Sequence, residues 1–99
     1  MPFRLEFTPE ATRQLLALKL DSGLSKRLKA VQKALARLES DPSHPGLNTH
    51  PFRGETCPHD GQLLEAYAEN STPGAYRIFF CYVPGVRGLI LIVAITPHP

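Results

Sequence analysis

The spacing of apolar residues changes twice along the first half of the chain. Residues 3–7 alternate between apolar and charged side chains, a period of two that predicts a short strand with one buried face. Residues 8–10, Thr-Pro-Glu, have the composition of a helix start: a capping hydroxyl, a first-turn proline and a first-turn acid. We therefore expect a helix from there to about Leu20, ending near Gly23, a residue suited to a left-handed C-cap.

A second amphipathic helix is predicted over residues 24–39. Its apolar positions recur every three or four residues and form one face: Leu28, Val31, Leu35 and Leu38. The opposite face is basic and carries Lys26, Lys29, Lys33 and Arg37. Such a face is either simply solvated or a surface that follows phosphates or binds an acidic partner. We take its residues 29, 33 and 37 as candidates for substrate binding. Because only a short break separates the two helices, we expect an antiparallel helical hairpin.

The second half of the chain predicts a loop followed by three strands. Prolines within residues 41–46 end the second helix, and the whole stretch 41–61 is predicted to be a long loop. Apolar and aromatic residues then predict strands at 62–67, 75–82 and 89–95, joined by short Pro/Gly turns. The last of these is apolar at every position, so both of its faces should be covered.

Together these elements predict one α+β domain over residues 1–99. Their order is a strand, a helical hairpin and a three-stranded antiparallel meander. The helices should pack on one face of a four-stranded, mainly antiparallel sheet. Since the hairpin covers one face only, we expect a partner protein, a second copy of the chain or the 41–61 loop to cover part of the other face.

Composition narrows the class of function. The chain has 99 residues and a formal net charge of only +2, which is mild for a protein whose main task is to grip nucleic acid. No apolar run is long enough to cross a membrane, and the first residues lack the pattern of a secretory signal, so we expect a cytoplasmic protein. Two cysteines are too few for a disulfide framework, and a bridge between Cys57 and Cys81 is not expected.

A metal site is the first chemical possibility, because the 41–61 loop contains several metal-ligating residue types. They are His44, His50, Cys57 and His59. Their spacing matches none of the paired motifs that hold structural zinc. We therefore expect polar loop residues here, with no metal and no cofactor.

A metal-free ribonuclease site is the second possibility. Cleavage of RNA by its own 2′-hydroxyl requires a base for that hydroxyl, a cation for the phosphorane and an acid for the leaving oxygen. His50 could be the base and His98, at the end of the last strand, the acid, because histidine titrates near neutral pH. Arg77, inside an otherwise apolar strand, could be the fixed cation, and Arg53 would add phosphate binding.

Plainer explanations of the same residues stay open. Arg77 would be a structural ion-pair partner of Glu65 or Glu69 on the preceding strand, and either glutamate is also an alternative base. His98 would be a frayed terminal residue, and His50 an ordinary loop residue.

The chain resembles the RelE/ParE toxin superfamily over nearly its whole length. The resemblance rests on the element order, the Phe-Thr-Pro-Glu-Ala opening at residues 7–11, the Tyr-Arg-Ile strand at 76–78 and the hydrophobic final strand. In YoeB-like members an acid–base residue precedes a Leu-Lys-Gly stretch. Here residues 50–54 are His-Pro-Phe-Arg-Gly, so the resemblance gives those roles to His50 and Arg53.

The resemblance also identifies Arg77 with the family's strand arginine, and His98-Pro99 with its terminal His-Tyr pair. It implies a small bacterial toxin that is neutralised by a cognate antitoxin. RelE-type members cleave mRNA on the ribosome, whereas ParE-type members inhibit gyrase. The leading hypothesis is a metal-independent mRNA endoribonuclease whose partners are the antitoxin, the ribosome and mRNA, and whose oligomeric state is open.

Two departures from the family favour an alternative hypothesis. Pro99 replaces the terminal tyrosine that often stacks on a base, and the net charge is low for a ribosome-dependent nuclease. The alternative is a noncatalytic toxin-like protein, either a gyrase inhibitor or a module that only forms an antitoxin complex.

Overall fold

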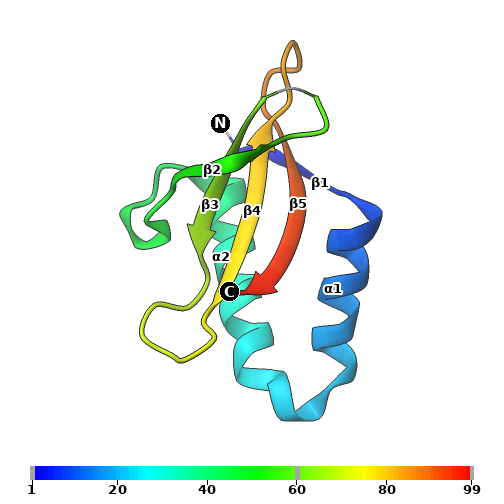
Figure 1. The fold of residues 1–99 in the computed structure, drawn as a ribbon, viewed down its shortest axis with the longest axis vertical. Coiled ribbons are helices and arrows are strands. Elements are labelled where there is room, and N and C mark those ends of the chain that lie inside the picture. Colours follow the sequence, from blue (N-terminus) through cyan, green and yellow to red (C-terminus); the bar gives the residue numbers. More distant parts are fainter. Residues whose placement is uncertain (1, 60, 99) are drawn as a thin grey trace.

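A mixed β-sheet with a helical hairpin on one face makes up the structure (Figure 1). It is a computed structural model that describes residues 2–59 and 61–98. In chain order the strands, α-helices and 3₁₀ helices (η) are β1 (Arg4–Phe7), α1 (Pro9–Leu20), η1 (Ser22–Leu24), α2 (Ser25–Ser40), η2 (Pro45–Leu47), β2 (His50–Thr56), β3 (Gln62–Tyr67), β4 (Tyr76–Tyr82) and β5 (Leu89–Pro97). None of the helices within the described residues is long and apolar enough to span a lipid bilayer.

The strands lie in the order β1-β5-β4-β3-β2. β1 pairs parallel with β5, and the other three pairs are antiparallel. The predicted α+β class and the placement of the hairpin on a mainly antiparallel sheet are confirmed. The sheet has five strands rather than four, because β2 lies inside the segment that we expected to be a loop. Pro51 is tolerated there because β2 is an edge strand.

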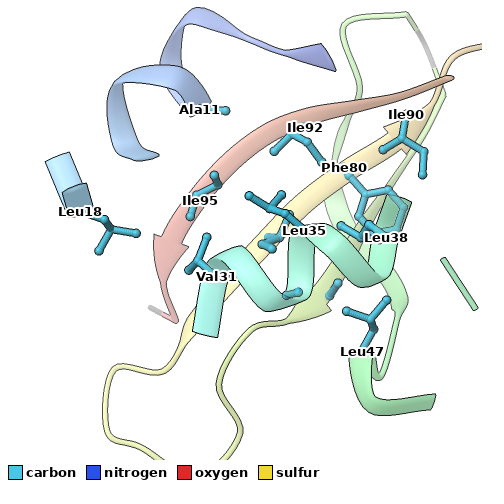
Figure 2. Packing of buried hydrophobic residues seen from close by; sticks show 13 residues of the cluster. Ala11, Leu18, Val31, Leu35, Leu38, Leu47, Phe80, Ile90, Ile92 and Ile95 are labelled. Atoms are coloured by element: carbon cyan, nitrogen blue, oxygen red, sulfur yellow. The ribbon is translucent and has the colours of Figure 1, made fainter. Parts of the chain in front are cut away.

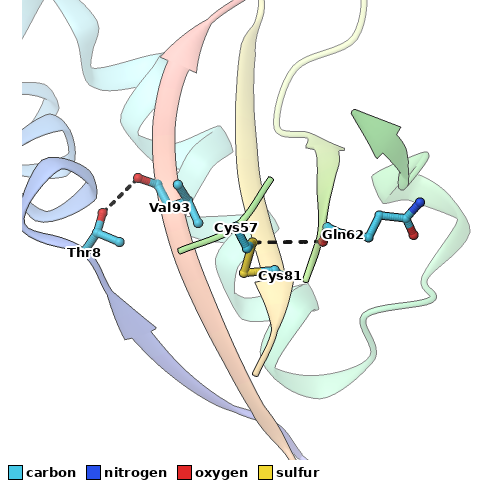
Figure 3. Close-up of a disulfide and its surroundings, with 5 residues drawn as sticks. All are labelled: Thr8, Cys57, Gln62, Cys81 and Val93. Atoms are coloured by element: carbon cyan, nitrogen blue, oxygen red, sulfur yellow. Dashed lines mark hydrogen bonds between the residues drawn. A yellow bond between two sulfur atoms is a disulfide. The ribbon is translucent and has the colours of Figure 1, made fainter. Parts of the chain in front are cut away.

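Thr8 fixes the start of α1 and attaches it to the sheet. Its Oγ1 accepts a hydrogen bond from the Ala11 backbone N–H at 3.1 Å and donates one to the Val93 carbonyl at 2.8 Å (Figure 3). The Gln14 side chain accepts from the Ile95 N–H at 2.7 Å. These bonds cover the edge of β5 beyond the last residue that pairs with β1. The predicted N-cap is confirmed.

The predicted left-handed C-cap at Gly23 is wrong. α1 ends at Leu20, and Gly23 lies within η1. The Asp21 carboxylate accepts from the Gly23 N–H at 2.9 Å and so begins this 3₁₀ turn. A local side-chain hydrogen bond therefore replaces a glycine cap at this break.

Thr8→Ala should lower the free energy of unfolding by about 1–2 kcal/mol. The substitution removes both the helix cap and the hydroxyl hydrogen bond to β5. Thr12, exposed one turn later on the same helix, is the matched control, and Thr12→Ala should change stability by less than about 0.5 kcal/mol. Urea denaturation of both variants measures the difference. Indistinguishable midpoints would show that the Thr8 hydroxyl contributes nothing to the stability of the fold.

The main hydrophobic core lies between the helices and the sheet (Figure 2). Leu35 and Leu38 of α2 are buried in it, as the helical spacing predicted. They face side chains of β4 and β5, among them Phe80 and Ile92. No residue of β2 belongs to this core or to the half-buried residues packed on it within the described chain.

A second, smaller cluster covers part of the sheet face opposite the helices. Its buried members are Cys57, Leu63, Phe79 and Cys81. The Phe52 ring packs edge-on against Phe79, with the centroids 4.9 Å apart. Of the three possible covers for this face, the structure therefore shows a segment of the expected loop: β2 and the turn that follows it.

A disulfide joins Cys57 to Cys81, which corrects our expectation that they would stay unpaired (Figure 3). The two residues are 24 positions apart, so nothing local brings them together. They meet because the chain after β2 folds back over β4. The predicted free loop over residues 41–61 does not include this contact.

Candidate active site on the helix-free face of the sheet

Four polar or aromatic side chains lie next to one another on the sheet face opposite the helices. The register pairs His50 of β2 with Glu65 of β3, and Tyr67 of β3 with Arg77 of β4. Directly paired residues of antiparallel strands point to the same side. The alternation of β3 places Glu65 and Tyr67 on one face. The four side chains therefore form a single cluster across three strands.

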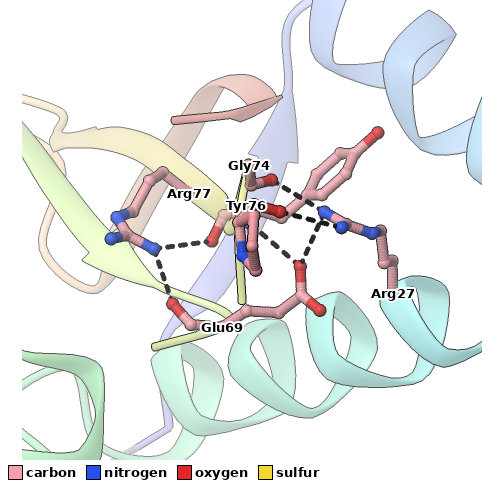
Figure 4. A network of polar contacts seen from close by, with 6 residues as sticks. Arg27, Glu69, Gly74, Tyr76 and Arg77 are labelled. Atoms are coloured by element: carbon pink, nitrogen blue, oxygen red, sulfur yellow. Dashed lines mark hydrogen bonds and ion pairs between the residues drawn. The ribbon is translucent and has the colours of Figure 1, made fainter. Parts of the chain in front are cut away.

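Arg77, like Glu65, is a buried charge of the cluster. Its side chain is only 8% exposed, and its guanidinium carbon lies 3.7 Å from the centroid of the Tyr67 ring. Nη1 donates to the Glu69 carbonyl at 2.5 Å (Figure 4). Nε lies 3.6 Å from Glu65 Oε2. The ring face and the carboxylate together stabilise a positive charge that has lost most of its water. The pairing of Arg77 with Glu65 that the plainer explanation anticipated is present.

The Glu69 side chain has a structural position instead. Its Oε1 accepts from the Tyr76 N–H at 3.0 Å and from Arg27 Nη1 at 3.3 Å (Figure 4). Arg27, on α2, also donates to the carbonyls of Pro73 and Gly74. This network ties the β3–β4 loop to the helix. Between the two glutamates considered as an alternative base, Glu65 is the one whose carboxylate faces the cluster.

Both ring nitrogens of His50 face acceptors. Nδ1 lies 2.8 Å from the Asn48 carbonyl, and Nε2 lies 2.8 Å from Glu65 Oε1. A carbonyl only accepts, so Nδ1 carries a hydrogen. The contact between Nε2 and Oε1 then requires a second proton, bound to either the imidazole or the carboxyl group. His50 and Glu65 therefore form one unit that fixes the imidazole and holds a shared proton.

His98 extends the ladder between β4 and β5 by one bond. Its backbone N–H donates to the Ala75 carbonyl at 2.7 Å, so its backbone is tied to the sheet. Its exposed side chain and Arg77 line one hollow of about 360 Å³, closed on the other side by the loop 70–75. Arg77 thus lies between the His50–Glu65 unit and the hollow that His98 lines. Pro99 lies outside the described residues.

The other sequence-predicted binding residues are not part of this cluster. Arg53 is exposed on β2, and within the described residues it forms no hydrogen bond or ion pair. Lys29 and Lys33 are exposed on α2, which covers the opposite face of the sheet. Arg37 is half-buried and packs beside Gly46. Their role in substrate binding stays a prediction, and it would require RNA to contact more than one face.

Tyr67 is the member of the site that sequence reasoning missed. The period of two in β3 placed Tyr67 on the same face as Glu65, which was a usable signal. Its position beneath Arg77 depends on the register of β3 against β4, which the sequence does not specify. The cysteines give no metal site with the loop histidines, because Cys57 is bound in the disulfide.

Solved structures share this fold at low sequence identity. The YoeB dimer from Staphylococcus aureus matches with a TM-score of 0.70 and 12% identity over 100% of both chains. YafQ from E. coli strain BL21(DE3) matches with a TM-score of 0.64 and 12% identity, covering 97% of this chain and 93% of that one. The E. coli DinJ–YafQ complex matches with a TM-score of 0.60 and 11% identity over the same shares.

No family model matches the chain, and no curated protein matches it in sequence. At identities near 12% the likeness is one of fold. It confirms the RelE/YoeB-like arrangement that the sequence predicted.

Proposed function

We propose that this chain is the toxin of a bacterial toxin–antitoxin pair and that it cleaves mRNA at the ribosome without a metal ion. The observation that carries the proposal is the position of Arg77, fixed between a histidine–carboxylate unit and a hollow lined by a second histidine. The fold shared with YoeB and YafQ supports the toxin assignment. Its proposed location is the cytoplasm, where mRNA and ribosomes are found.

The partners follow from the same comparison. One similar structure is a complex of YafQ with DinJ, and another is a dimer of YoeB. By analogy, a cognate antitoxin is the first partner of this chain, and a second copy of the chain is another candidate partner. The analogy is one of fold.

Each step of the reaction has a candidate group. The Glu65 carboxyl group keeps the shared proton. His50 Nε2, left without a hydrogen, exchanges its contact with Glu65 for a hydrogen bond to the ribose 2′-hydroxyl and takes the proton of that hydroxyl. Hydrogen bonds of this kind are often rearranged only in the substrate complex. Arg77 stabilises the charge of the phosphorane, and His98 donates a proton to the departing 5′-oxygen. Arg53 contributes a positive charge for neighbouring phosphates.

The rigidity of Arg77 suits this role. Tyr67, Glu65 and the Glu69 carbonyl hold the guanidinium in place before substrate arrives. A preorganised charge in a site with little water stabilises a developing anion without reorganising during the reaction. The hollow shared with His98 is the side from which a phosphate would approach.

One observation favours the noncatalytic alternative. Arg77 is largely enclosed, and both ring nitrogens of His50 are engaged within the protein. A cluster of this kind can serve only to hold three strands together. In that case the chain would act by binding gyrase or another target, and its antitoxin would block that surface.

Expression of the chain alone should arrest growth and produce mRNA fragments, and co-expression of a cognate antitoxin, to be sought in the neighbouring gene, should restore growth. Attack by the 2′-hydroxyl leaves a 2′,3′-cyclic phosphate, so the fragments should carry that end or its hydrolysis product.

His98→Ala should slow cleavage by about 10²–10⁴-fold, because it removes the acid. Arg87→Ala, at an exposed position in the β4–β5 turn, is the control and should cleave normally. Growth arrest by folded His98→Ala, with intact mRNA throughout, would establish the noncatalytic alternative.

A further inference from the structure

The disulfide between Cys57 and Cys81 is a covalent link between β4 and the chain after β2, and the proposed reaction does not use it. We propose that it is a redox-controlled latch that holds β2, and with it His50, against the sheet. Its reduction releases β2 while the rest of the fold stays intact. The latch itself follows from the structure alone, and its effect on RNA cleavage rests on the proposed function.

β2 is weakly attached by backbone pairing. It is an edge strand that, within the described residues, has β3 as its one neighbour in the sheet. Its register is interrupted between Pro51 and Thr56. Residues 53–56 are all exposed, so they contribute little burial. An edge strand with an interrupted ladder and few buried side chains is among the first parts of a fold to open.

The disulfide compensates for this weak pairing. Cys57 follows β2 directly, and Cys81 lies within β4, so the bond reaches past β3 to the middle of the sheet (Figure 3). Both cysteines are buried. Beside them, Phe52 packs on Phe79, and this small cluster forms part of the floor of a hollow of about 690 Å³. Without the bond, β2 would be held by the Phe52 contact, the interrupted ladder and the contacts of His50 with Glu65 and Tyr67.

The remainder of the fold does not depend on β2. The main core is built by the two helices, β3, β4 and β5, with Leu47 from η2. Within the described residues β2 adds no side chain to it. Reduction should therefore loosen one strand and leave the helices and the central strands in place.

His50 is the residue through which the latch reaches the site. It is the first residue of β2, and its Nε2 lies 2.8 Å from Glu65 Oε1. Glu65 and Arg77 sit on the central strands and keep their places. If β2 moves, the imidazole loses its fixed position relative to Arg77, and a displacement of about 1 Å in a catalytic group is enough to slow a reaction about 10²-fold.

The switching chemistry is thiol–disulfide exchange. A thiolate of a dithiol reductant attacks one sulfur of the bond, and the second thiol of that reductant resolves the mixed disulfide. Two electrons pass to the chain, which gains two thiols, and the reductant becomes a disulfide. Cytoplasmic thiols are normally kept reduced, and disulfides found there are usually redox-sensing or catalytic. In the proposed location the latch would therefore be open under ordinary reducing conditions, where a basal rate of cleavage remains for the growth assay. It would close under oxidising conditions, and the cleavage rate would then rise.

Amide hydrogen exchange on the full chain tests the latch, with dithiothreitol as the reductant. Reduction should speed exchange across residues 50–57 and leave α2, β4 and β5 protected. Reoxidation should restore the original pattern. The double variant Cys57→Ser with Cys81→Ser is the control: exchange at 50–57 should be fast with or without dithiothreitol. If that variant does not fold, the reversible reduction of the wild type still decides the question. Unchanged exchange at 50–57, or equal loosening of the whole sheet, would overturn the proposal.

RNA cleavage is measured on the same samples. Reduction should lower the wild-type rate by up to about 10²-fold. Released β2 with an unchanged cleavage rate would show that the latch does not control the site. If the oxidised protein cleaves no RNA, the proposed function fails, while the exchange data still accept or reject the latch.

Discussion

Arg77→Ala is expected to lower the rate of RNA cleavage by about 10²–10³-fold, because it removes the charge that stabilises the transition state. Arg77→Lys should recover only part of this loss. A lysine keeps the charge but has neither the planar fork nor the stacking on Tyr67 that hold the guanidinium in place. Cleavage assays on purified wild type and both variants give the three rates.

Burial makes a folding control necessary for these variants. Removal of Arg77 leaves the buried Glu65 with His50 as its remaining partner, and an uncompensated buried charge destabilises a fold. Rates are therefore compared only for protein whose circular dichroism matches the wild type. Arg87→Ala removes an exposed arginine from the β4–β5 turn and should change neither rate nor fold. If folded Arg77→Ala cleaves at the wild-type rate, Arg77 is only a structural ion-pair partner, and the catalytic assignment fails.

Leu38→Ala should lower the free energy of unfolding by about 2–5 kcal/mol. Leu38 is fully buried between α2 and the sheet, at 0% exposure, so its truncation leaves a cavity in the main core. Leu20, at the end of α1, is 77% exposed, so the same substitution there is the matched control. Leu20→Ala should change stability by less than about 0.5 kcal/mol.

Chemical denaturation of the two leucine variants measures this contrast directly. The chemistry of the substitution is identical, so the difference between them reports burial alone. Similar losses in both variants would mean that α2 does not pack on the sheet through the face that contains Leu38.

The helices and the three central strands were predictable because their signals are local. A repeat of three and four residues buries one side of a helix, and the hydroxyl of Thr8 caps the turn next to it in sequence. β3 and β4 are short segments rich in apolar and aromatic residues, β5 is largely apolar and rich in β-branched residues, and turns bound all three. The hydrophobic pattern of each strand can be recognised from its own residues, without knowing which strands lie beside it.

β2 was not predictable in this way, because the contacts that stabilise it come from residues far away in the sequence. Pro51 and Gly54 interrupt its pattern, and most of its side chains are exposed. It becomes a strand because β3 offers an edge and because Phe52 finds Phe79 across the sheet. The disulfide is missing from the sequence analysis for the same reason, since two cysteines 24 residues apart show nothing about their separation in space.

The same distinction between local pattern and tertiary contact applies to the candidate site. The residue pattern alone places an arginine inside an apolar strand, histidines at positions 50 and 98, and a basic face on α2. Which of these side chains come into contact depends on how the strands pair and on where α2 packs. The strand register joins His50, Glu65, Tyr67 and Arg77 on one face, while α2 holds its lysines on the other. The physical reason is that residue type and periodicity act over a few neighbouring positions, whereas register and the packing of one element on another depend on the whole chain.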